Sequence, residues 1–138
     1  MRIVLLTVGT AKQPFTGADA HYRKLLDRYQ QVDVLEARDG AHLVAKLPRE
    51  GRVVALDREG SGLDSVGWSR WLAERRLEAR DVCIAIGGAD GLPEAALERA
   101  DERISLGAVT LPHQLARVVV LEQLFRAAKI LAGEPYHR

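Results

Sequence analysis

Residues 82–92, with the sequence VCIAIGGADGL, decide the fold. The run Val82–Ile86 is continuously apolar, as is typical of a strand that is buried on both faces of a parallel sheet. A glycine-rich turn follows over 87–91, and Pro93 then suits the first turn of a short helix over 93–99. This order of strand, turn and helix predicts an α/β fold with a parallel sheet.

The rest of the chain repeats this alternation, and no linker or internal repeat interrupts it. We therefore predict a single domain that spans residues 1–138. At the start of the first helix, Thr16 and Asp19 have the spacing of a capping box. The predicted strands are Ile3–Val8, Val32–Ala37, 52–56, Val82–Ile86 and 103–106, and the predicted helices are 16–29, 41–47, 64–77, 93–99 and 112–131.

Composition excludes several classes of protein. Twenty Lys and Arg residues against 19 Asp and Glu give a net charge of +1, which argues against a strongly basic nucleic-acid wrapper, so any nucleic-acid contact must come from a local patch. The single cysteine, Cys83, cannot form an internal disulfide, and the histidines have no metal-ligand spacing. The first apolar run is too short for a signal peptide or a membrane span. We expect a cytoplasmic protein without a metal site.

The last predicted helix, 112–131, has more apolar residues than one buried stripe requires. Either the helix is fully buried within the chain or its second apolar face forms a homodimer interface, and in so small a domain we favour the interface. The apolar residues are Leu115, Val118, Val119, Val120, Leu121, Leu124, Phe125, Ile130 and Leu131.

Three loops, over 56–62, 86–91 and 106–113, each follow a predicted strand. Ligands bind at the carboxyl ends of parallel strands, so we expect the three loops to meet in one pocket, although the glycines could also form a turn without a ligand. Ala89 replaces the second glycine of a dinucleotide fingerprint, and no phosphate-binding loop motif occurs. A nucleoside-triphosphate enzyme is therefore disfavoured.

Several motifs together resemble one known family. They are IGGADGL at 86–92, SLGAVTLPH at 105–113, Arg117, Glu122-Gln123, Arg126 and PYHR at 135–138. Over essentially the whole chain, the sequence resembles the large-subunit (23S-type) rRNA pseudouridine N3-methyltransferases of the SPOUT class. The resemblance implies a C-terminal trefoil knot that holds S-adenosylmethionine (SAM), and a homodimer that completes the active site. The segment 36–52 is shorter than is usual in the family, and Gly107 replaces a frequent Ser.

The resemblance also indicates which residues bind SAM, mostly through the backbone. Adenine can hydrogen-bond to main-chain groups and pack its faces against leucine and valine side chains. SAM has no phosphate and therefore needs no basic cradle, so the main tasks of the protein are to align the reactants and to keep the pocket dry. The residues implied are Leu56, Gly87, Leu106, Gly107, Ala108, Val109, Thr110 and Leu111.

The acceptor implied by the resemblance is N3 of a pseudouridine, whose proton must leave before or during attack. His113, at a helix N-terminus that favours its neutral form, suits a base or hydrogen-bond acceptor, although it could simply cap the helix. Arg117, one turn on, could bind phosphate or the charged ring, or form a surface ion pair. Tyr136, His137 and Arg138 could stack on a base and bind phosphate, or form a frayed end. Which residue takes the proton stays open.

The expected partners are a second copy of the chain and rRNA within the ribosome. Residues 113–138 contain four Lys and Arg against two Glu, a small surplus for a protein that binds RNA alone. We therefore expect poor activity on naked RNA. Two alternatives remain: a methyltransferase with another RNA target, such as tRNA, and a non-catalytic module that associates with the ribosome.

Overall fold

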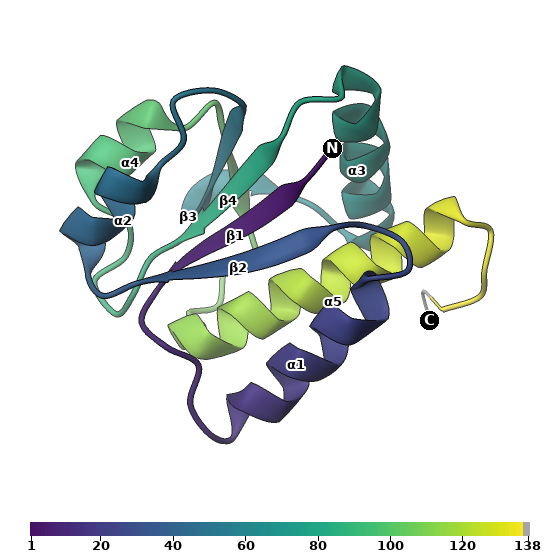
Figure 1. Ribbon diagram of the computed structural model, residues 1–138, viewed down its shortest axis with the longest axis horizontal. Coiled ribbons are helices and arrows are strands. Elements are labelled where there is room, and N and C mark those ends of the chain that lie inside the picture. The colour runs from purple at the N-terminus through teal and green to yellow at the C-terminus, as the bar shows by residue number, and fades with distance from the viewer. Residues whose placement is uncertain (137–138) are drawn as a thin grey trace.

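The structure, a computed structural model, describes residues 1–136. Five parallel strands form a sheet in the order β2-β1-β4-β3-β5, with helices on both of its faces (Figure 1). The strands are β1 (Ile3–Val8), β2 (Val32–Ala37), β3 (Arg52–Gly62), β4 (Val82–Ile86) and β5 (Glu102–Ser105). The helices are α1 (Phe15–Leu26), α2 (Gly40–Lys46), α3 (Ser65–Glu78), α4 (Glu94–Arg99) and α5 (His113–Leu131).

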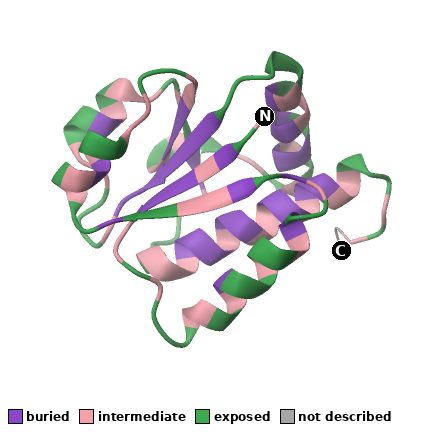
Figure 2. Ribbon diagram, viewed as in Figure 1, coloured by how far each residue is buried: buried purple, intermediate pink, exposed green. Residues whose placement is uncertain are grey.

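The central strand β4 is continuously apolar because both of its faces are buried. Val82, Ile84 and Ile86 contribute to the larger core, which lies beneath α1, α3 and α5. Cys83 and Ala85 face the smaller core beneath α2 and α4. All five residues are buried, as the purple strands in the centre of Figure 2 show. The prediction of a two-sided parallel strand is confirmed.

The predicted first helix differs from the observed one at both ends. α1 begins at Phe15 without a side-chain cap, and its last residue is Leu26, three residues before the predicted end. Thr16 Oγ1 is buried without a hydrogen-bond partner, so the predicted capping box does not form. Its expected partner, Asp19, instead binds Arg117 from α5, an interaction between residues too distant in sequence for a local pattern to indicate.

Helix α5 lies between α1 and α3, and nine of its 19 residues are buried. Five of the nine predicted apolar residues are among them: Val118, Val120, Leu121, Leu124 and Phe125. Leu115, Val119 and Ile130 are partly exposed and Leu131 is exposed, so packing inside one chain explains only part of the wide apolar surface, and the homodimer interface stays a prediction. Within residues 1–136, none of the helices is both long and apolar enough to cross a lipid bilayer.

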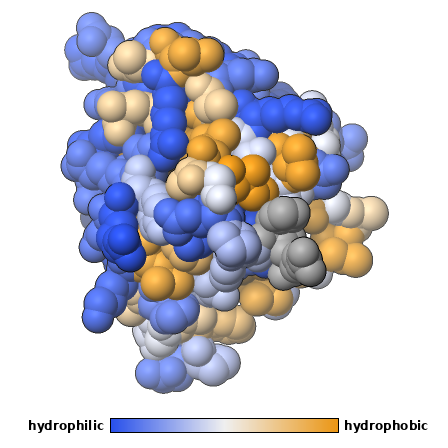
Figure 3. Space-filling view, turned by 90° about the vertical axis from the view of Figure 1, so that its right-hand side faces the viewer, coloured by the Kyte–Doolittle hydropathy of each residue, from blue (hydrophilic) through white to orange (hydrophobic). Residues whose placement is uncertain are grey.

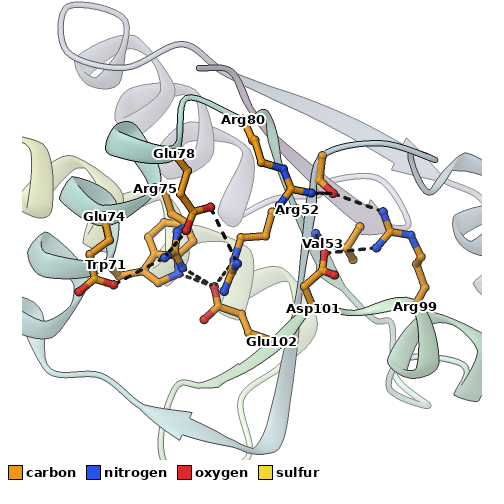
Figure 4. Close-up of polar contacts among 11 residues, drawn as sticks. Arg52, Val53, Trp71, Glu74, Arg75, Glu78, Arg80, Arg99, Asp101 and Glu102 are labelled. Atoms are coloured by element: carbon orange, nitrogen blue, oxygen red, sulfur yellow. Dashed lines mark hydrogen bonds and ion pairs between the residues drawn. The ribbon is translucent and has the colours of Figure 1, made fainter.

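A polar cluster joins the edge strand β5 to α3 (Figure 4). Glu102, the first residue of β5, accepts hydrogen bonds from Arg52 Nε (3.1 Å), Trp71 Nε1 (2.7 Å) and Arg75 Nη1 (3.2 Å). Trp71 and Arg75 are both buried. This carboxylate therefore satisfies two buried donors and fixes the strand that leads into the loop over 106–112.

We expect Glu102→Ala to destabilise the protein by about 2 kcal/mol, because the buried donors of Trp71 and Arg75 lose their shared acceptor. Thermal denaturation should show a midpoint about 5–10 °C lower. Glu98→Ala, at an exposed position of α4, is the matched control. Equal midpoints for the two variants would contradict this role of Glu102.

Candidate functional site

Four segments meet at the carboxyl edge of the sheet: residues 56–59 of β3, the loops that follow β4 and β5, and the first turn of α5. They enclose a pocket of about 490 Å³. The lining residues are Leu56, Asp57, Arg58, Glu59, Ile86, Gly87, Gly88, Ala89, Asp90, Gly91, Leu92, Ser105, Leu106, Gly107, Val109, Thr110, Leu111, His113 and Ala116. The three loops singled out in the sequence thus come together in space.

Most of the residues predicted to bind a ligand line this pocket. Those that do are Leu56, Gly87, Leu106, Gly107, Val109, Thr110 and Leu111, whereas Ala108 is absent from the lining.

We predicted a loop over 56–62, but the structure places this segment within β3; its residues 57–59 line the pocket. They lie in a register irregularity of β3 between Leu56 and Ser61, and β3 continues beyond it to Gly62. A Cβ on Gly60 would approach the carbonyl oxygen of Arg103 to 2.7 Å, so this close packing depends on glycine. The glycines of the segment EGSG, at 59–62, were the available signal for this irregular strand.

Two glycines of the pocket have different roles. A Cβ on Gly87 would lie 2.6 Å from both Gly91 O and Leu92 N, so its missing side chain makes room for its own turn, the alternative that the sequence left open. Gly107 has φ +119°, and a Cβ there would meet no atom within 4 Å. The conformation of the backbone, and not space, therefore requires glycine at 107.

The pocket combines an apolar surface with an acidic rim. Val109 is 68% exposed although it is apolar, so a ligand in the pocket could cover it. Asp57, Glu59 and Asp90 contribute three carboxylates, against the single guanidinium of Arg58. Such a rim favours a ligand with positive charge over one with phosphates.

His113 lies at the border between the pocket and the loop that follows β1. A Cβ on Gly9 would be 3.9 Å from His113 Nε2, so the imidazole lies beside this loop. The neighbouring Gln114 accepts a hydrogen bond from the backbone N–H of Lys12 (2.6 Å). The structure therefore places His113 at the pocket, at the N-terminus of α5, as the sequence predicted.

Arg117 is buried next to the pocket and has no face toward solvent. Its guanidinium donates to Asp19 (2.6 Å), Glu36 (2.8 Å) and Thr7 (3.3 Å). Burial by itself would lower the pKa of Arg117, but the hydrogen bonds to Asp19 and Glu36 raise it above its ordinary value. This corrects the expectation of a side chain available to a phosphate: Arg117 joins α5 to α1 and to the ends of β1 and β2.

Tyr136 lies at the other end of α5 from His113. Its ring packs edge-on against Phe125, with a centroid separation of 4.9 Å. Arg126 lies over the same ring at 4.8 Å and donates to the carbonyl oxygen of Tyr136. Burial, followed by the charge of Glu122, raises the pKa of Tyr136.

Tyr136 packs against Phe125, and the rise along α5 from His113 to Phe125 is roughly 18 Å, which separates Tyr136 from the pocket within one chain. The two other predicted tail residues, His137 and Arg138, lie outside the described residues. Within residues 1–136, no three His, Cys, Asp or Glu side chains gather as a potential metal site.

Comparisons with known proteins agree on one family. A family model described as "Predicted SPOUT methyltransferase" matches residues 1–137. "Ribosomal RNA large subunit methyltransferase H" of Gemmatimonas aurantiaca is 42% identical over the full length of both chains. The protein of the same name from Anaeromyxobacter sp. is 40% identical, again over both full lengths.

Solved structures agree in fold. A "Probable Methyltransferase" of Bordetella pertussis has a TM-score of 0.61 at 18% identity, with 92% of this chain and 96% of that chain covered. The SpoU methyltransferase AviRb of Streptomyces viridochromogenes, in complex with AdoMet, has a TM-score of 0.54 at 13% identity, with 97% of this chain and 59% of that chain covered. Together with the family model and the two full-length relatives, these similarities lead to one conclusion: the chain belongs to the SPOUT methyltransferase family.

Proposed function

We propose that this protein transfers the methyl group of SAM to N3 of a pseudouridine in large-subunit rRNA, within the assembled ribosome. The observation that carries the proposal is the pocket in which three strand-end segments meet, in a chain of the SPOUT methyltransferase family. The names of the full-length relatives support rRNA as the substrate class. A ribosomal substrate would place the protein in the cytoplasm.

The pocket fits SAM in its chemistry. Leu56, Leu106 and Leu111 offer apolar contacts for adenine, and loop backbone groups can bind the adenine edge. The carboxylates of the rim complement the positive sulfonium and ammonium groups, and the pocket contains no cluster of cations of the kind that a phosphate would need. When bound, SAM supplies a methyl group that is transferred by direct displacement.

We propose a homodimer in which the tail of each copy completes the pocket of the other. The supporting observation is the wide separation of Tyr136 from the pocket within one chain, with Arg126 fixing Tyr136 at the far end of α5. Apolar side chains remain partly exposed at this side of the molecule, where Figure 3 shows separate hydrophobic areas. Val66 and Leu131 are 41% and 39% exposed.

The proposal assigns different tasks to the predicted catalytic residues. His113 borders the pocket and can accept a hydrogen bond from the pseudouridine ring or hold its N3 proton. Tyr136, His137 and Arg138 of a second copy would stack on the base and bind its phosphate. Arg117 would act indirectly, because its guanidinium is occupied by Asp19, Glu36 and Thr7.

We also propose that the C-terminal part of the chain forms the trefoil knot implied by the family resemblance. The chain leaves the edge strand β5 and returns beneath the sheet as α5, between α1 and α3 (Figure 1). Loop 106–112, which lines the pocket, connects these two elements. The knot and the pocket would therefore share the same segment.

Two measurements test the function. Calorimetric titration with SAM should give saturable binding at sub-millimolar concentration. If SAM does not bind, the remaining alternative is a non-catalytic module that associates with the ribosome. Mass spectrometry of rRNA from cells without the protein should show one pseudouridine that lacks a methyl group. A complete rRNA modification pattern, with a methyl group missing from tRNA instead, would favour the alternative RNA target.

We expect Gly107→Val to lower the affinity for SAM by about 10- to 100-fold, because a β-branched residue at φ +119° costs roughly 1–3 kcal/mol and the loop must rearrange. Calorimetry measures the affinity. Gly62→Val is the matched control, since a Cβ there also meets no atom within 4 Å and no positive φ is involved. Unchanged affinity in Gly107→Val would show that this loop does not hold SAM.

A further inference from the structure

We infer that the solvent face of α1 and its flanking residues bind the phosphate backbone of the RNA substrate. This surface, the α1 strip, consists of Lys12, Lys24 and Arg28, with Arg23 at its border. The inference rests on the proposed function and adds the surface by which the substrate is held beside the pocket.

The α1 strip has a local surplus of positive charge in a chain whose net charge is only +1. Residues 10–31 contain four cationic side chains, all of them exposed, and two carboxylates, Asp19 and Asp27. Asp19 is buried, and its carboxylate accepts a hydrogen bond from Arg117 Nε on α5 (2.6 Å). Asp19 also forms an ion pair with Arg23 at 3.6 Å, so within residues 10–31 only Asp27 remains to oppose Lys12, Lys24 and Arg28.

Three of these cations have no ion-pair partner in the described part of the chain. The 13 salt bridges found within residues 1–136 include none to Lys12, Lys24 or Arg28. Lys24 and Arg28 are four residues apart, and like charges at this spacing destabilise a helix slightly. Glu134, whose pKa Arg28 helps to lower, is already bound by Lys129 and Tyr29. Among residues 1–136, Lys24 and Arg28 therefore form no direct ion pair with a carboxylate, although the charge of Glu134 attracts Arg28.

The position of the strip connects the two regions that the proposed reaction needs. At one end, the backbone of Lys12 is bound to Gln114, the residue after His113 at the pocket. At the other end, Arg28 precedes Tyr29, whose hydroxyl donates to Glu134 near the root of the tail. Between these ends α1 runs alongside α5 (Figure 1). The 12 residues of α1 span about 18 Å, enough for several consecutive phosphates.

The chemistry of the strip fits a sequence-independent contact with nucleic acid. Lysine and arginine side chains that neutralise phosphates release counterions, so binding weakens as the salt concentration rises. For a single strand, each such contact adds about 0.7 to the steepness of the plot of log binding constant against log salt concentration. The exposed side chains of Gln13, His21 and Gln31 lie on α1 or beside it, but the four cations outnumber them and make the phosphate backbone the main contact. Choice of the target base would stay with the pocket and the tail.

The test compares two double variants. Lys24→Gln/Arg28→Gln should raise KM for large ribosomal subunits about tenfold at 0.15 M salt, leave kcat and SAM affinity unchanged, and reduce the logarithmic salt slope by about 1.4. Lys46→Gln/Arg49→Gln removes two cations near the opposite face, on and after α2, and should behave as the wild type.

An unchanged KM and salt slope in the α1 variant, or an equal change in both variants, would overturn the inference. A change in oligomeric state, measured by analytical ultracentrifugation, would also overturn it and would make the strip an interface between copies. Failure of the proposed function is a separate result, because the wild type itself would then transfer no methyl group to rRNA.

Discussion

Removal of residues 136–138 is expected to lower the rate of methyl transfer by about 10²–10⁴-fold, the range typical of lost acid–base or charge-stabilising groups. Affinity for SAM should change by less than about twofold, because Tyr136 is absent from the pocket and lies near the far end of α5. Single-turnover transfer to large ribosomal subunits and calorimetry with SAM measure the two quantities.

A shorter truncation, of residues 137 and 138 alone, is the control for packing. It keeps the contacts of Tyr136 with Phe125 and Arg126, so its thermal midpoint should equal that of the wild type. If both truncated proteins transfer the methyl group at the wild-type rate, the tail has no part in the reaction.

Arg117→Met is expected to destabilise the protein by about 3 kcal/mol, because it leaves the buried carboxylate of Asp19 with only the partly exposed Arg23, at 3.6 Å, as a partner. Glu36 and Thr7 lose contacts with the same guanidinium, and Glu36 also accepts from the backbone of Ala11 in the loop beside His113. Chemical denaturation measures the free energy of unfolding.

The matched double variant Asp19→Leu/Arg117→Met removes both buried charges and should recover most of the lost stability. Methyl transfer should recover with it if Arg117 only positions α5 and the neighbouring loop. A double variant that is stable but transfers no methyl group would instead show that Arg117 acts directly on the substrate.

The sequence predicts well those features that depend on local pattern. The apolar run Val82–Ile86 predicts a strand with two buried faces, and the segments 56–62, 86–91 and 106–113 predict one pocket, which residues of all three line. Both predictions follow from general properties of parallel sheets, which bury both faces and collect ligands at one edge.

Features that depend on distant residues were not predictable in the same way. Asp19 has the spacing of a capping residue, yet its partner is Arg117, 98 positions later. The wide apolar surface of α5 fits either burial or an interface, and its pattern does not show which of its residues α1 and α3 cover. The irregular course of β3 depends on the close approach of Gly60 to the backbone of Arg103, which no local pattern encodes.

The central claim is that the SAM pocket of one copy works with the tail of another. Gly107→Val protein, which keeps its tail, can be mixed with an equal amount of protein that lacks residues 136–138 but keeps its pocket, under conditions in which subunits exchange. The SAM concentration is kept far below the dissociation constant of the Gly107→Val variant, so that its pocket stays empty. Half of the dimers then combine one intact pocket with one intact tail, so methyl transfer should return to about a quarter of the wild-type rate. A mixture no more active than either variant alone would contradict the claim.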